Sequence, residues 1–124
     1  MGRAMVVDDS RATRMILSNM LVESGFDVLQ APNGKEALDL MNRDGASLTL
    51  VTVDWNMPEM SGLDFVLAVR ARPEFARVHL LMITTETEME QMCRALDAGT
   101  DEYLMKPFTV EAVRDKLRIL GVVE

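Results

Sequence analysis

Short apolar runs alternate with longer amphipathic stretches along the whole chain, and this alternation predicts strands separated by helices. The runs expected to form strands span residues 4–8, 27–31, 48–54, 78–83 and 102–105. The third and fourth runs are almost continuously apolar, which is typical of strands covered on both faces. The pattern therefore predicts a sheet whose central strands are buried.

Polar residues with helix-capping chemistry stand before several of the amphipathic stretches. At such a position a side-chain oxygen accepts a hydrogen bond from a free backbone N–H group of the first helical turn. The residues expected to cap helices are Asn33, Ser61, Thr87 and Thr109. Gly25 and Gly99 mark the expected ends of two helices, and the last helix is expected over residues 110–120.

Apolar residues at helical spacing predict which helix faces are buried. The first helix carries such a stripe at Met15, Ile16, Met20 and Leu21. In the fourth helix the single cysteine, Cys93, stands among Met89, Met92 and Leu96. We expect Cys93 to lie in or near the core.

Five successive β-α units indicate an α/β protein with a parallel sheet and helices on both faces. The economical arrangement is a doubly wound, flavodoxin-like sheet of five strands in the order 2-1-3-4-5, with five helices. The 124 residues fit one domain, so we expect a single unit over residues 1–124 with no output domain.

Composition narrows the classes of function. The 20 acidic residues outnumber the 13 basic ones and give a net charge of −7, which disfavours binding to nucleic acid. One cysteine cannot form an internal disulfide, and no apolar run approaches the roughly 20 residues of a membrane helix. We therefore expect a cytoplasmic protein without membrane insertion.

Acidic residues follow two of the predicted central strands. Asp8 and Asp9 end the first strand and Asp54 ends the third, so all three are expected in the crevice at the carboxyl edge of the sheet. Three carboxylates in one crevice repel one another unless a proton or cation compensates them. Mg²⁺ suits such oxygen ligands. Taken alone, the Asp8–Asp9 pair would be explained as a cap of the following helix.

The other two strands at this edge end in different chemistry. Thr84 provides a hydroxyl group after the fourth strand, and Lys106 with Pro107 provides a cation after the fifth. Carboxylates, a hydroxyl and an ammonium together suit phosphoryl transfer, which depends on positioning and charge neutralisation. Asp54 is central in the sheet, so it is the expected nucleophile.

These residues resemble the receiver domain of bacterial response regulators, most of all the single-domain chemotaxis-type members. The resemblance rests on Val-Val-Asp-Asp at 6–9, Asp-Trp-Asn-Met-Pro at 54–58 with Gly62, Thr84, and Lys-Pro-Phe at 106–108. It covers nearly the whole chain. It implies a phosphorylation-activated switch of a two-component phosphorelay, in which Asp54 accepts a phosphoryl group from a histidine kinase.

The resemblance also implies roles for the neighbouring residues. Asp9, Asp54 and the backbone carbonyl of Asn56 would bind Mg²⁺, and Asp8 would act through water. Thr84 would donate a hydrogen bond to the phosphoryl group, and Lys106 would form an ion pair with it. The Lys106–Pro107 peptide bond would be cis. Tyr103 would then turn inward and change the face formed by the fourth helix, fifth strand and fifth helix, where a downstream protein binds. Trp55 would border the metal site and report on it by fluorescence.

Several positions depart from the commonest family pattern. Thr85 stands where a smaller residue is frequent and is expected to restrict access to the acceptor. Asn56 and Glu86 are polar neighbours of the kind associated with quick self-dephosphorylation, so a short-lived phosphoryl state is expected. Acidic residues near the output face favour a partner with a basic surface: Glu88, Glu90 and Glu102.

Three alternatives remain at the level of sequence. A haloacid-dehalogenase-type phosphatase also uses a strand-end aspartate, but its second acid would fall at Asn56. A flavin-binding protein shares the fold, but Asp8 and Asp9 would repel a flavin phosphate. The third alternative is a receiver-like interaction module that binds its partner irrespective of phosphorylation.

Overall fold

The computed structural model describes residues 2–85 and 89–123, with the backbone alone at residue 46. Within these residues five strands alternate with five α-helices. In chain order they are β1 (Arg3–Val7), α1 (Arg11–Glu23), β2 (Asp27–Ala31), α2 (Gly34–Asp44), β3 (Leu48–Asp54), α3 (Gly62–Arg70), β4 (His79–Thr84), α4 (Met89–Ala98), β5 (Glu102–Met105) and α5 (Val110–Leu120). Two 3₁₀ turns, η1 (Gly45–Ser47) and η2 (Pro73–Phe75), precede β3 and β4.

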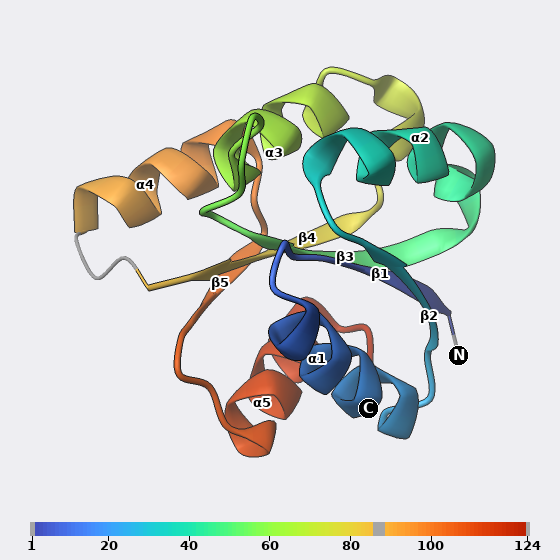
Figure 1. Cartoon of the computed structure of the whole chain (residues 1–124), viewed down its shortest axis with the longest axis vertical. Coiled ribbons are helices and arrows are strands. Elements are labelled where there is room, and N and C mark those ends of the chain that lie inside the picture. The colour runs from blue at the N-terminus through green and yellow to red at the C-terminus, as the bar shows by residue number, and fades with distance from the viewer. Residues whose placement is uncertain (1, 86–88, 124) are drawn as a thin grey trace.

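All strand pairs are parallel, and the strands lie in the order β2-β1-β3-β4-β5. Helices α2, α3 and α4 cover one face of the sheet, and α1 and α5 cover the other (Figure 1). The predicted doubly wound, flavodoxin-like architecture is therefore confirmed. The chain reverses its winding between β1 and β3, which is where ligands bind in sheets of this kind.

Each face of the sheet has its own hydrophobic core. Side chains of β3 alternate between them, because successive residues of a strand point to opposite faces. Val51 and Val53 pack with α2, α3 and α4, whereas Leu50 packs with Leu17 of α1 and Leu117 of α5. This two-sided burial explains why the run of β3 is almost continuously apolar.

The predicted boundaries hold for β2, β3, β5 and the last helix, while β1 and β4 are displaced by one residue from residues 4–8 and 78–83. The cause lies in strand pairing, since β1 pairs from Arg3 and β4 from His79. The caps at Asn33, Ser61 and Thr109 are confirmed by hydrogen bonds from the first helical turns. The predicted cap Thr87 lies outside the described residues.

The buried face was predicted in part for α1 and wrongly for α4. In α1, Leu21 is buried and Met20 packs on the core as expected, but Met15 and Ile16 are exposed and Leu17 is buried instead. Cys93 is exposed on α4 rather than near the core. In α4, which packs beside α3 near the β5 edge of the sheet, only Ala95 among the described residues is buried, so its larger apolar side chains stay near the surface.

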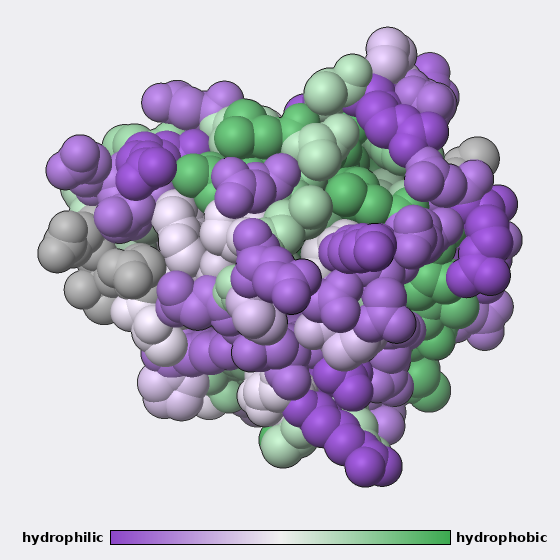
Figure 2. All heavy atoms as spheres, turned by 45° about the horizontal axis from the view of Figure 1, so that its top comes forward, coloured by the Kyte–Doolittle hydropathy of each residue, from purple (hydrophilic) through white to green (hydrophobic). Residues whose placement is uncertain are grey.

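Surface polarity is uneven over the layer of α2, α3 and α4. Figure 2 shows apolar side chains gathered between the helices in the upper part of the face, with polar side chains over most of the rest. Leu67 of α3 and Leu96 of α4 are among the exposed apolar residues. Among the described helices, none has the length and apolar character that a membrane crossing requires.

Candidate functional site

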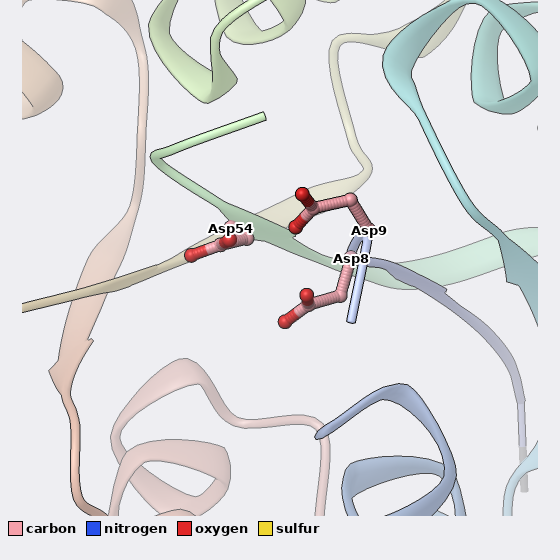
Figure 3. Close-up of side chains that lie close together, drawn as sticks. All are labelled: Asp8, Asp9 and Asp54. Carbon is pink, nitrogen blue, oxygen red and sulfur yellow. The ribbon is translucent and has the colours of Figure 1, made fainter. Parts of the chain in front are cut away.

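Three carboxylates meet at the carboxyl ends of β1 and β3. Asp8 and Asp9 follow β1, Asp54 ends β3, and each offers an oxygen within 4.8 Å of the others. Figure 3 shows the three side chains close together, with their carboxylates extending to the same side. Asp8 and Asp54 are buried, whereas Asp9 is exposed. The cluster thus has a buried floor and an opening to solvent.

Lys106 supplies the cation of this centre from the end of β5. Its Nζ lies 3.2 Å from Oδ1 of Asp54 and 3.6 Å from Oδ2 of Asp8. The backbone N–H of Lys106 donates to the carbonyl of Thr84 at 2.8 Å, which ties the ends of β4 and β5 together. The Lys106–Pro107 peptide bond is cis, as the resemblance implied.

The surroundings of Asp54 oppose its ionisation. Burial raises the pKa of its carboxyl above the ordinary value, and the charge of Asp8 raises it further. Lys106 lowers that pKa through its charge and hydrogen bond, but does not cancel the other effects. A cluster of this kind stabilises a bound proton or an additional cation.

The donor set fits Mg²⁺. Hard carboxylate oxygens are its preferred protein ligands, and it keeps several waters, for which the exposed side at Asp9 leaves access. Asp9 and Asp54 are the side chains that could hold the ion directly. Asn56 is exposed two residues beyond the end of β3, and the part of its backbone carbonyl in binding remains a prediction.

A glycine makes the approach of the β3–α3 loop to Asp54 possible. The N–H of Gly62 donates to the carbonyl of Trp55 at 2.9 Å. A Cβ atom at Gly62 would lie only 2.4 Å from the carbonyl oxygen of Asp54. A larger residue at position 62 would therefore push against the backbone of Asp54, the predicted acceptor.

Three further predicted residues lie at the ends of the strands that carry this centre. Thr84 is buried at the end of β4, and Thr85 is exposed beside Lys106 and Pro107 in a shared hollow. Trp55 is half-buried next to Asp54 and packs on the core under α2, α3 and α4. The predicted modulator Glu86 lies outside the described residues, as does Glu88.

Tyr103 is half-buried on β5. Lys116 Nζ lies 4.9 Å from the centroid of its ring, a distance suited to a cation–π contact. The same Nζ forms an ion pair of 3.1 Å with Glu102. Part of the acidic charge predicted beside Tyr103 is therefore compensated within the chain.

One contact of the site was not anticipated from the sequence. Arg14 of α1 donates from Nη1 to the backbone carbonyl of Asp8 at 2.8 Å. Its Nε donates to Oε1 of Gln30 at 3.2 Å. The only available signal was its position one helical turn after the cap at Ser10, and this signal does not specify a partner.

Fold and site together define a doubly wound α/β protein with a carboxylate–lysine centre at its switch point. Residues 4–118 match the family described as response regulator receiver domain, and the chain belongs to that family. Receiver domains are signalling switches that take phosphate from histidine kinases and bind Mg²⁺ at an acidic pocket. They act on downstream targets.

Three similar proteins are matched over nearly their whole length. The chain is 42% identical over 119 residues to the chemotaxis protein CheY1 of Helicobacter pylori, covering 95% of each chain. It is 42% identical over 121 residues to a chemotaxis protein CheY homolog of Campylobacter jejuni, covering 96% of this chain and 92% of the relative. The structure of the Vibrio cholerae chemotaxis protein CheY4 superposes with a TM-score of 0.89 at 34% identity, covering 97% and 98% of the two chains. The chain is thus a receiver domain of the CheY type, in two-component signalling.

Proposed function

We propose that Asp54 is the phosphoacceptor of a Mg²⁺-dependent switch that works in the cytoplasm. The observation that carries this proposal is the meeting of Asp54 with two further carboxylates and the Lys106 ammonium, 3.2 Å away. Of the three acids, Asp54 is the one whose carboxylate contacts Lys106 most closely. It is also the one at the end of β3, the middle strand of the five.

In the proposed reaction an oxygen of Asp54 forms a bond to phosphorus while the bond from phosphorus to a nitrogen of the kinase histidine breaks. The product is an acyl phosphate, and the histidine nitrogen leaves with the electron pair. The nucleophile must be ionised, and burial and the charge of Asp8, which raise the pKa of Asp54, oppose this ionisation. Lys106 lowers that pKa and so favours the ionised form.

The other residues bind and orient. Asp9 and Asp54 would hold Mg²⁺, with the Asn56 carbonyl as a third ligand, and Asp8 would act through water. When bound, the ion neutralises charge on the carboxylates and on the phosphoryl oxygens. Thr84 donates its hydroxyl to the phosphoryl group, and Lys106 pairs with it. The product would be short-lived, because Asn56 and Glu86 favour attack by water.

The output face comprises α4, β5 and α5. Movement of Thr84 toward the phosphoryl group would let Tyr103 turn inward and change this face, a local charge change that biases a two-state element. We propose a protein partner with a basic surface there. The names of the relatives support chemotaxis as the process.

The test is intact mass after incubation with Mg²⁺ and acetyl phosphate, a small acyl phosphate. The expected result is one added phosphoryl group, lost in Asp54→Asn and without Mg²⁺. If no group is added, a purified kinase and Thr85→Ala come next, because Thr85 borders Lys106 in the hollow. Continued absence of phosphorylation would refute the proposal and support the phosphorylation-independent module.

A further inference from the structure

Arg14 joins three parts of the chain at the edge of the acidic cluster. Its guanidinium donates to the carbonyl of Asp8, in the loop between β1 and α1, and to the side chain of Gln30 near the end of β2. The contact with Asp8 measures 2.8 Å and is partly buried. Because the guanidinium is planar and donates to both acceptors, it fixes the orientation of the Asp8 carbonyl as well as its distance from Arg14.

The carbonyl that Arg14 binds belongs to the peptide that links Asp8 to Asp9. Rotation of this peptide would turn the backbone of both residues, and with it the directions of both carboxylates. The Asp8 carboxylate has its own support, since its Oδ1 accepts from the N–H of Ser10 at 2.8 Å. Asp9 is exposed, and its side chain accepts no hydrogen bond from any of the described residues. Its orientation thus depends on the backbone.

We propose that Arg14 is a positioning residue for Mg²⁺, which acts by fixing the Asp8–Asp9 peptide so that Asp9 faces Asp54. This inference rests on the proposed function, because it assigns Arg14 to the same metal site. Partners that orient metal ligands typically contribute about 10-fold to 100-fold in metal affinity. Charge alone predicts the opposite sign, since removal of a nearby cation would favour Mg²⁺ binding.

Positioning predicts weaker Mg²⁺ binding without Arg14, and charge alone predicts tighter binding. A Mg²⁺ titration of the purified protein distinguishes them, with the fluorescence of Trp55, its only tryptophan, as the signal. We expect Arg14→Met to raise the Kd for Mg²⁺ about tenfold. Arg14→Lys keeps the charge but loses the planar guanidinium that donates to two acceptors. Its Kd should lie between those of Arg14→Met and the parent protein. The matched control is Arg11→Met, because Arg11 is an exposed cation of the same helix and its side chain forms no hydrogen bond or ion pair with the described residues.

Melting temperature in EDTA separates positioning from general stability. A merely structural role would lower this temperature without changing the Kd of the folded protein. An equal or tighter Kd in Arg14→Met would overturn the inference and leave the metal site intact. If Arg14→Met does not fold, a parental Kd in Arg14→Lys would overturn it instead. A parent protein without saturable Mg²⁺ binding would overturn both this inference and the proposed function.

Discussion

Arg70, at the end of α3, is predicted to contribute more to stability than any surface cation with a single partner. Its guanidinium donates to the carbonyls of Gly99, Phe75 and Val78 at 2.8–2.9 Å, and more weakly to that of Ala76. It also forms an ion pair of 2.9 Å with Asp101. These contacts tie the end of α3 to the start of β4 and to the turn between α4 and β5.

The magnitude follows from three short, partly buried hydrogen bonds and one ion pair. Each hydrogen bond is worth about 1 kcal/mol net, and the partly exposed ion pair adds about 0.5 kcal/mol. Arg70→Met keeps most of the aliphatic stem, so the expected loss in free energy of unfolding is about 3 kcal/mol. With an unfolding entropy of roughly 2.1 cal/mol/K per residue, this loss lowers the melting temperature by about 12 °C.

Urea unfolding followed by circular dichroism measures this loss. Arg77→Met is the matched control, since Arg77 is an exposed arginine nearby whose side chain forms no hydrogen bond or ion pair within the described ranges. Its loss in free energy of unfolding should stay within about 0.5 kcal/mol. Arg70→Lys should recover only part of the stability, because one ammonium cannot reach all the carbonyls. If Arg70→Met and Arg77→Met unfold at the same urea concentration, the reasoning from these hydrogen bonds is refuted.

Three further predictions concern other parts of the chain. Because burial and Asp8 raise the pKa of Asp54, its ionisation opposes folding, and Asp54→Asn should raise the melting temperature at pH 7 in EDTA. That gain should vanish at pH values below the ordinary carboxyl pKa, where Asp54 is protonated in both states, and a gain independent of pH would contradict the explanation. In Gly62→Ala the new Cβ would lie 2.4 Å from the Asp54 carbonyl, so calorimetry should show a loss of about 1–3 kcal/mol. Phosphorylation of this variant, measured by mass, should also slow, and normal values of both would refute a tight fit. Cys93 is exposed, so a maleimide should label it in the native protein, and protection until urea is added would contradict its position.

The strand pattern could be predicted because strands buried on both faces are marked by apolar runs that polar residues end. The run at 48–54 is of this kind and matches β3. The run at 27–31 also matches β2, an edge strand that is only partly buried. The ends of β1 and β4 depend on which residues pair across the sheet, and composition does not determine that. Asp8 illustrates the difficulty, since its N–H still bonds the carbonyl of Ala31 although it lies beyond β1.

The buried faces of the helices were less predictable, because an apolar side chain does not by itself indicate whether it packs on the sheet or stays at the surface. In α4 the methionine and leucine pattern suggested a buried Cys93, yet a helix near a sheet edge buries only a narrow stripe, here Ala95. The acidic centre could be predicted from the rule that parallel strands end together at one edge. Arg14 and Arg70 could not, since long side chains reach partners that only the tertiary structure brings near.

The charges of the centre indicate why a cation and Lys106 are both needed in the proposed switch. The three carboxylates of Asp8, Asp9 and Asp54 carry three negative charges when ionised, and Mg²⁺ together with Lys106 carries three positive ones. A phosphoryl group on Asp54 replaces one carboxylate charge by a group of about −2, so the balance is broken by roughly one negative charge. Lys106 and the Thr84 hydroxyl, at the ends of the two neighbouring strands, are the groups that can respond, and the N–H of Lys106 bonds the Thr84 carbonyl. In the proposed switch, a movement of either residue would therefore involve both β4 and β5, and Tyr103 lies on β5.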